Sequence, residues 1–440
     1  MSESTIEAAI VPKEFIKLYQ HYAGKALSWG KYTHPNPLTP PALILFLESH
    51  YLFDRAEQMN SYLLSSTCLR ILLKMGLHRD PSKLANLTPF EGEMRRRCWN
   101  MAMQIEILLS FHAGLPSMLQ GVETDTEVPR NLHDDDFDEN TTSLPPSRPP
   151  TDCTSITYAG YKTGLLRAFG LVAQQAHALS TPTYAEVMKI DAIVQTAWSQ
   201  IPIFLKAKPL VECVSDPPSI TIQRFGMSAL YDKTRCVLHR RYLAELDLKP
   251  EHEYSRKQCL EGAIALLGYQ QIIWQACQPG QMFSQYRWFV TSLALHDFIL
   301  AAMILYLIIK NEKWFDRNGD DDDDDDDASA SMSISHSRDE LKSMLKSSHS
   351  IWAELASSIP ELRKTAGVIA AMLAKVGCPV TPGSTILSEN SESRQTNFLR
   401  KNGFDYETPS VGYISNTISE EFPQPSLSGS RLPPKTLQRY

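Results

Sequence analysis

The chain has 440 residues, with 43 Lys and Arg against 50 Asp and Glu, and its formal net charge is −7. A run of eight aspartates, Asp320 to Asp327, supplies that excess, because without it 42 acidic residues would face 43 basic ones. This balance excludes a strongly basic protein that tracks nucleic-acid phosphates. The hydrophobic content of 43% is ordinary for a globular chain, and the length allows one large domain or two to three smaller ones.

The cysteines and the apolar segments indicate a reducing compartment and no membrane span. The eight cysteines are widely spread and form no C-x-x-C pair, which disfavours a disulfide framework. The first ten residues are polar and acidic and do not resemble a secretory signal. The apolar stretch 289–309 is interrupted by His296 and Asp297, so it is predicted to be a buried helix of a large core.

Apolar residues recur with a period near 3.6, and no convincing hairpin signal is present. The fold class is therefore predicted to be all-α, a large irregular multi-helix bundle. Thr88 and Glu91 form a capping box that begins one helix at Pro89, and Gly114 closes it. The same reasoning predicts helices over residues 12–29, 41–56, 58–75, 155–179, 184–200, 219–245, 254–277 and 286–310.

Composition divides the chain into four parts. Residues 1–310 are predicted to be two helical halves of one domain, joined by an acidic, Pro-rich loop over 133–152. The acidic and Ser-rich insertion over 311–337 is predicted to be disordered, because it cannot bury apolar surface. A helix pair over 338–376 would close the domain, and residues 377–440 would form a disordered tail.

Several short motifs occur in a specific order along the first half. They are Met75-Gly-Leu-His-Arg-Asp80, Glu93-Met-Arg-Arg-Arg-Cys-Trp99, Gly114-Leu-Pro116, and an acidic loop after Val128-Pro129. In this order they resemble the fungal-specific transcription factor domain, the middle regulatory region of zinc binuclear-cluster activators. The resemblance covers roughly residues 12–376 and includes Leu230-Tyr231 and Leu238-His-Arg240. The motif residues to which it assigns a structural role are Gly76, Leu77, His78, Arg79, Asp80, Glu93, Arg95, Arg96, Arg97, Trp99, Gly114, Pro116 and Pro129.

The sequence departs from that family at its beginning. The family carries an N-terminal module of six clustered cysteines that holds two zinc ions and reads DNA, whereas the first cysteine here is Cys68. Asn100, Glu106 and Leu115 also stand where the family usually has Trp, Asp and Arg. The resemblance thus implies a regulatory domain without direct DNA contact from these residues, and no metal or DNA-binding residue is predicted.

Three charged motifs are better explained by structure than by chemistry. Glu91 and Glu93 each precede an arginine of the run 95–97 by four residues, which predicts helix ion pairs rather than a nucleic-acid patch. His78-Arg79-Asp80 is predicted to end a helix, with His and Arg meeting its last carbonyls. The stretch 133–136 lacks the spacing of a calcium loop and is predicted to be a solvated acidic loop.

His296 and Asp297 are the candidate functional pair. Two ionisable groups in an apolar helix carry a desolvation cost unless they have partners. They are interpreted either as the polar groups of an effector pocket or as a satisfied hydrogen-bonded pair in the core. The aspartate run 320–327 is interpreted as a solvated spacer, with a transcriptional activation segment as the alternative.

The sequence contains no nucleophile elbow, phosphate-binding loop, metalloprotease motif or dinucleotide-binding motif. We therefore predict no catalytic residue, no cofactor and no enzymatic activity. The leading hypothesis is a regulator of transcription, in the nucleus or in both nucleus and cytoplasm. It would pair with a DNA-binding transcription factor partner, form a homodimer or heterodimer, or sequester its partners, and its signal would be a small-molecule effector or a partner protein. The alternatives are a metabolite-binding or enzymatic protein of a biosynthetic pathway that reuses the helical fold, and a pure interaction scaffold.

Overall fold

The computed structural model describes residues 13–53, 58–245, 249–284, 295–311, 314–315, 336–359 and 362–379. Within these ranges the chain forms helices and no strand, which confirms the all-α prediction. The helices are α1 (Lys13–Trp29), α2 (Thr39–Phe53), α3 (Gln58–Lys74), α4 (Pro89–His112), α5 (Thr157–Ala176), α6 (Tyr184–Ser199), α7 (Pro218–His239), α8 (Glu253–Ala276), α10 (Leu295–Lys310), α11 (Arg338–Ser358) and α12 (Arg363–Lys375).

The acidic run 320–327, most of the insertion 311–337 and the tail from residue 380 onward lie outside the described residues. The predictions of disorder for these segments therefore stay predictions. The division of the chain into domains likewise stays a prediction. No described helix is long and apolar enough to cross a membrane.

Helix ends follow local sequence signals. The capping box predicted at Thr88 is present, since its side chain accepts from the backbone N–H of Glu91 while the Glu91 carboxylate accepts from the N–H of Thr88. Thr183 and Ser337 cap α6 and α11 in the same way. Gly76 ends α3 at φ +73°, the left-handed conformation that favours glycine. These signals explain why predicted and observed boundaries agree closely at most helices.

One boundary lies well away from the prediction, and another falls outside the described residues. The helix expected over 219–245 ends at His239 and continues as a 3₁₀ helix to Leu243. The helix expected from residue 286 is described only from Leu295 onward, because 285–294 lie outside the described residues. Helix α4 is buried on almost every side.

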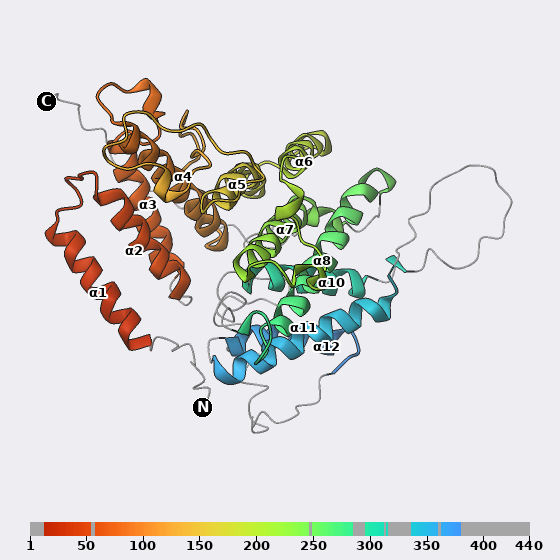
Figure 1. Cartoon of the computed structure of the whole chain (residues 1–440). Coiled ribbons are helices and arrows are strands. Elements are labelled where there is room, and N and C mark those ends of the chain that lie inside the picture. Colours follow the sequence, from red (N-terminus) through yellow and green to blue (C-terminus); the bar gives the residue numbers. More distant parts are fainter. Residues whose placement is uncertain are drawn as a thin grey trace, which may run out of the picture.

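The reason is that α4 lies between two hydrophobic clusters. On one side Met103, Ile107 and Phe111 belong to the large cluster formed by α5 to α12. On the other side Trp99 and Leu109 belong to a smaller cluster formed with α2 and α3. Figure 1 shows the corresponding arrangement, with α1 to α4 on one side of the molecule and α7 to α12 on the other. Helix α5 packs against both α4 and α7 and so joins the two halves.

Candidate functional site

A polar cluster centred on a buried lysine lies where the two halves meet, and we call it the junction cluster. It consists of Gln58 at the start of α3, His112 at the end of α4, Lys233 of α7, and His296 and Asp297 in the first turn of α10. Two of its contacts, Gln58–His296 and Lys233–His112, join residues that are more than 100 positions apart in sequence. Two helices of the N-terminal half are thereby connected to two helices of the C-terminal half.

Lys233 is the centre of the cluster, and only 2% of its side chain is exposed. Its Nζ lies 2.8 Å from Oδ1 of Asp297 and 3.2 Å from Nε2 of His112. The same ammonium group lies 5.2 Å from the ring centres of Phe111 and Phe169. A buried cation needs such compensation, and here one carboxylate, one imidazole and two aromatic faces supply it.

The two imidazoles form the second layer of the cluster. His112 and His296 stack with ring centres 4.6 Å apart and an interplanar angle of 28°. Nε2 of His296 lies 2.6 Å from the amide nitrogen of Gln58. Tyr51, near the end of α2, also stacks with His112, with ring centres 6.2 Å apart. The aromatic stack thus continues from α10 through α4 to α2.

Burial controls the electrostatics of these rings. It lowers the pKa of His296 to about 4, with the charge of Lys233 acting in the same direction and that of Asp297 against it. Burial, followed by the charges of Lys233 and His296, lowers the pKa of His112 well below its usual value. Burial and the carboxylate of Asp297 raise the pKa of the Tyr51 hydroxyl. At neutral pH the junction cluster therefore holds one ion pair among uncharged aromatic groups.

The sequence identified His296 and Asp297 but missed the residues that they meet. Lys233 could have been found, since it lies three residues after Leu230 and four before Val237 and so occupies a core position of α7. His112 is the last residue of α4, the helix predicted to begin at Pro89. No sequence pattern places Gln58 beside His296, because they are 238 positions apart.

The motif around Asp80 builds a buried ion pair outside the junction cluster. Arg96 donates two hydrogen bonds to Asp80, at 2.9 Å and 2.7 Å, and Ser82 and the N–H of Glu127 donate to the same carboxylate. Burial alone would raise the pKa of Asp80, but the hydrogen bonds from Arg96 and Ser82 prevail and lower it. The motif thereby fixes the loop after α3 against α4 and the segment near Glu127.

The predicted capping role of the neighbouring His78 and Arg79 side chains is wrong. The His78 ring lies 6.2 Å from that of buried Trp99, and Arg79 pairs with Asp125 at 3.3 Å. The last carbonyls of α3 are met instead by the backbone N–H groups of Gly76 and Leu77. These amides already lie in the Schellman arrangement, so no side chain is needed there.

The arginine run serves three separate contacts. Arg97 lies 3.6 Å from Glu93, as the helical spacing predicts, and 2.6 Å from Asp134. The ion pair expected between Glu91 and Arg95 is absent from the described contacts, because Glu91 closes the capping box and Arg95 donates to the carbonyl of Met75 at 2.7 Å. All three guanidinium groups are thus engaged within the protein, since Arg96 binds Asp80.

The turn after α4 is positioned by a buried carboxylate. Gly114 adopts φ +68°, and the carbonyl of Pro116 accepts from the hydroxyl of Tyr62 at 2.9 Å. Glu106, which is fully buried, accepts from the N–H of Met118 and from Ser65 of α3. The loop after Pro129 is fixed similarly, because the N–H of residue 130 donates to Glu93. The motif residues thus stabilise the packing around α4.

The acidic loop 133–136 forms ion pairs with neighbouring arginines. Asp136 binds Arg148 through both of its oxygens, at 2.7 Å and 2.8 Å, and Asp134 binds Arg97. Among the described residues no group of three or more His, Cys, Asp or Glu side chains is arranged to hold a metal ion. The acidic residues here are partners of structural arginines.

A Ser–His–Asp chain that the sequence did not reveal lies between α6, α7 and α8. Ser255 is 2.9 Å from Nδ1 of His239, whose Nε2 is 3.1 Å from Asp191. Tyr254 also donates to Asp191, at 2.8 Å. At most 2% of any of the three triad residues is exposed, so no substrate reaches the hydroxyl. The chain of hydrogen bonds is therefore suited to joining three helices and not to nucleophilic catalysis.

Comparison with known proteins places these features in a family context. Residues 6–162 match the model of the fungal-specific transcription factor domain, which confirms the resemblance inferred from the motifs. The chain is 32% identical over 361 residues to the Zn(2)-C6 fungal-type transcription factor mpsB of Macrophomina phaseolina. That alignment covers 82% of this chain and 48% of the relative.

Two further relatives have the same character. The chain is 31% identical to the pyrrolocin cluster transcription factor fsdR of a fungal species, over 96% of this chain and 53% of the relative. It is 30% identical to the Zn(2)-C6 fungal-type transcription factor pigI of Monascus ruber, over 83% of this chain and 44% of the relative. The chain thus spans about half the length of these relatives. No solved structure matches it. The matched family and these relatives are transcription factors and not enzymes, so the enzymatic alternative is not favoured.

Proposed function

We propose that this chain is the regulatory part of a nuclear transcription regulator of a biosynthetic gene cluster. The observation that carries the proposal is its similarity to transcription factors, one of them named for the pyrrolocin cluster. Direct DNA contact would be made by protein outside these 440 residues. The near-neutral charge outside the aspartate run and the internal engagement of Arg95, Arg96 and Arg97 support this division of labour.

A tethering experiment tests the regulatory role. Residues 1–440 are fused to an unrelated DNA-binding module and expressed in a fungal host that carries a reporter with the matching site. We expect reporter output to change several-fold relative to the module alone, and a fluorescent fusion of the chain to accumulate in nuclei. An unchanged reporter together with a cytosolic fusion would contradict the proposal.

We further propose that the regulatory signal, a small-molecule effector or a partner contact, acts by shifting the two halves at the junction cluster. The support is that the Lys233–Asp297 pair is buried among groups from both halves, so a relative movement of α10 and α4 changes its solvation. Two-state switches commonly rest on packed interfaces that have two discrete arrangements, and the proposal assigns two such arrangements to this junction.

The signalling step is tested with an apolar replacement of the ion pair. Lys233→Met/Asp297→Leu removes both charges at once, so the variant should fold. The reporter output of the tethered variant should no longer differ between growth conditions that induce the gene cluster and conditions that do not. Arg148→Met/Asp136→Leu, which removes an ion pair from the acidic loop, is the matched control and should keep that difference. Unaltered induction in the first variant would contradict a role of the junction cluster in signalling.

A further inference from the structure

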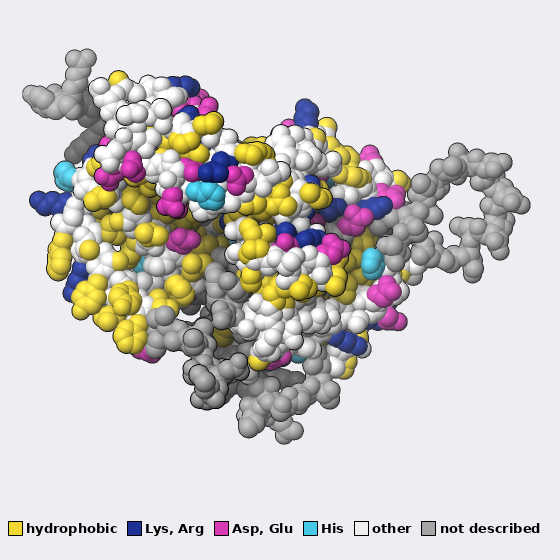
Figure 2. Space-filling model, viewed as in Figure 1, with side chains coloured by type: hydrophobic (Ala, Val, Ile, Leu, Met, Phe, Trp, Pro, Cys, Tyr) yellow, Lys and Arg dark blue, Asp and Glu magenta, His cyan; other side chains and the backbone are white. Residues whose placement is uncertain are grey.

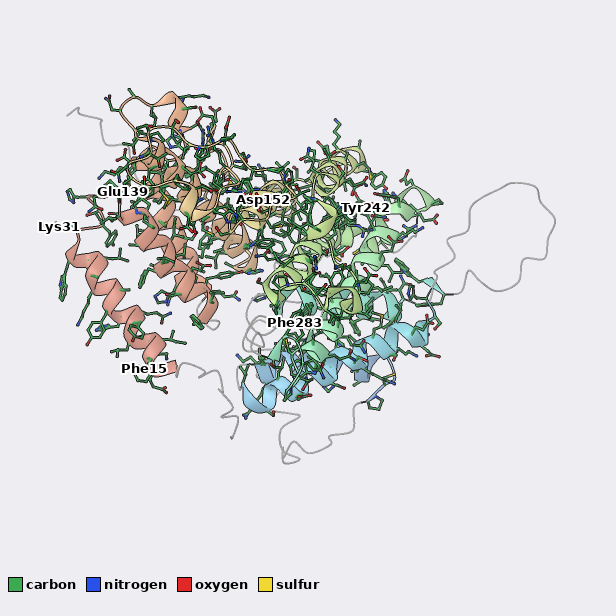
Figure 3. The ribbon with its side chains drawn as sticks, viewed as in Figure 1. Phe15, Lys31, Glu139, Asp152, Tyr242 and Phe283 are labelled. Carbon is green, nitrogen blue, oxygen red and sulfur yellow. The ribbon has the colours of Figure 1, made fainter. Side chains whose placement is uncertain are left out.

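The edge of the molecule formed by α1 and α2 exposes a continuous apolar surface. Trp29 is 81% exposed, Tyr19 is 68% exposed and Leu45 of α2 is 66% exposed. Figure 2 shows apolar side chains gathered along this edge. In Figure 3, Phe15 and Lys31 lie at its two ends. The exposed large side chains of this edge are Phe15, Leu18, Tyr19, Tyr22, Trp29, Leu38, Leu45 and Phe53.

A groove runs between the two helices on this edge. Its cavity volume is about 620 Å³. Ala23 and Ala26 of α1, Gly30 just after α1 and Ala42 of α2 line it, and the small size of these residues leaves the groove open. Larger apolar side chains, among them Tyr19 and Leu45, form its walls. Exposed apolar surface of this extent is rare on a protein that acts alone, and aromatic side chains are enriched at the centres of protein interfaces.

We infer that this groove binds an amphipathic helix of a partner protein, with acidic residues beside its apolar face. The groove has the shape that helix-in-groove recognition requires, in which apolar side chains at helical spacing of one protein enter a long apolar depression of the other. This inference rests on the proposed function, because it gives the chemistry of one partner through which the regulator acts.

The charge of the edge formed by α1 and α2 determines which kind of partner helix the groove binds. Residues 13–53, which form this edge, contain four Lys against two Glu, whereas the whole chain is acidic. Lys25 borders this apolar surface, with its Nζ 6.0 Å from the ring centre of Tyr22. Lys31 is exposed just after the end of α1. A second copy of the same basic edge would bring like charges together, so an acidic partner helix is favoured over self-association.

The binding test uses the full chain and two synthetic peptides. Both carry leucines at i, i+3, i+7 and i+10, one with glutamates and the other with lysines at the flanking positions. We expect saturable binding of the acidic peptide, and binding about tenfold weaker after Tyr19→Ala, as for an interface hot spot. Lys25→Glu/Lys31→Glu should invert the preference, whereas Lys189→Glu/Lys257→Glu, at exposed positions of α6 and α8, should not.

Each outcome decides between alternatives. Absence of saturable binding, or equal binding of both peptides, would overturn the inference. Concentration-dependent dimers that Ala26→Glu abolishes would show that a second copy occupies the groove, and would overturn it as well. If the tethered reporter responds while Tyr19→Ala leaves its output unchanged, the proposed function stands and the inference fails. If the acidic peptide binds but the tethered chain is inactive, the proposed function fails and the groove assignment stands.

Discussion

Helices α10 and α1 have nearly the same length but opposite surroundings. Helix α10 packs against α7, α8, α11 and α12, and Phe298, Leu305 and Ile309 are almost fully buried. Helix α1 packs mainly against α2, and Gln20 is its only buried residue among the described side chains. An apolar stripe therefore indicates that a helix packs against a partner. The topology of the chain determines whether that partner is another helix of the same chain.

The largest expected effect concerns α10, the buried helix of the two, and its ion pair with Lys233. Lys233→Met leaves the carboxylate of Asp297 buried without its cation, so we expect the free energy of unfolding to fall by about 3–5 kcal/mol. The double variant Lys233→Met/Asp297→Leu should recover most of that loss. Urea denaturation followed by circular dichroism measures both. A double variant as unstable as the single one would show that the ion pair stabilises the junction in itself.

A matched pair of leucine truncations tests the contrast between the two helices directly. Leu305→Ala of α10 removes a fully buried side chain and should cost about 3 kcal/mol through lost burial and the cavity left behind. Leu18→Ala of α1 removes an exposed side chain and should change stability by less than about 0.5 kcal/mol. Similar losses in both variants, measured by urea denaturation, would mean that α1 is covered in solution.

Acidification should weaken the junction. The fold lowers the pKa of His296 from 6.5 to about 4, so between these values the unfolded chain binds more protons and stability falls as the pH drops. The shift corresponds to about 3 kcal/mol of stability lost across this pH range. His296→Gln should make the unfolding midpoint depend less steeply on pH between 6.5 and 4, while His112, whose pKa is also lowered, keeps part of that dependence. His34→Gln, at an exposed imidazole, serves as the control and should leave it unchanged.

Sequence reasoning was most effective where structure is decided locally. The capping box at Thr88 and the left-handed Gly76 were both predictable, because their contacts span at most a few residues. The Lys233–His112 contact was not, since it depends on how two halves pack. The predicted Glu91–Arg95 pair failed for a related reason: Glu91 was already used by the cap, and the carbonyl of Met75 competes for Arg95.

The smallest expected effect concerns α4, the helix that both clusters share. Thr88→Ala removes the hydroxyl that accepts from the N–H of Glu91 and should cost about 1 kcal/mol. Thr67→Ala, which removes an exposed hydroxyl within α3, is the control and should cost less than about 0.5 kcal/mol.

Hydrogen exchange shows how far the loss of the cap spreads. Because α4 contributes to both hydrophobic clusters, amide protection should fall in α3 and α5 together. Helix α1, which depends mainly on α2, should exchange fastest in either protein. Reduced protection confined to α3 would show that the two clusters open separately. The buried and exposed regions of the molecule would then be two separate folding units, and not the interior and the edge of a single unit.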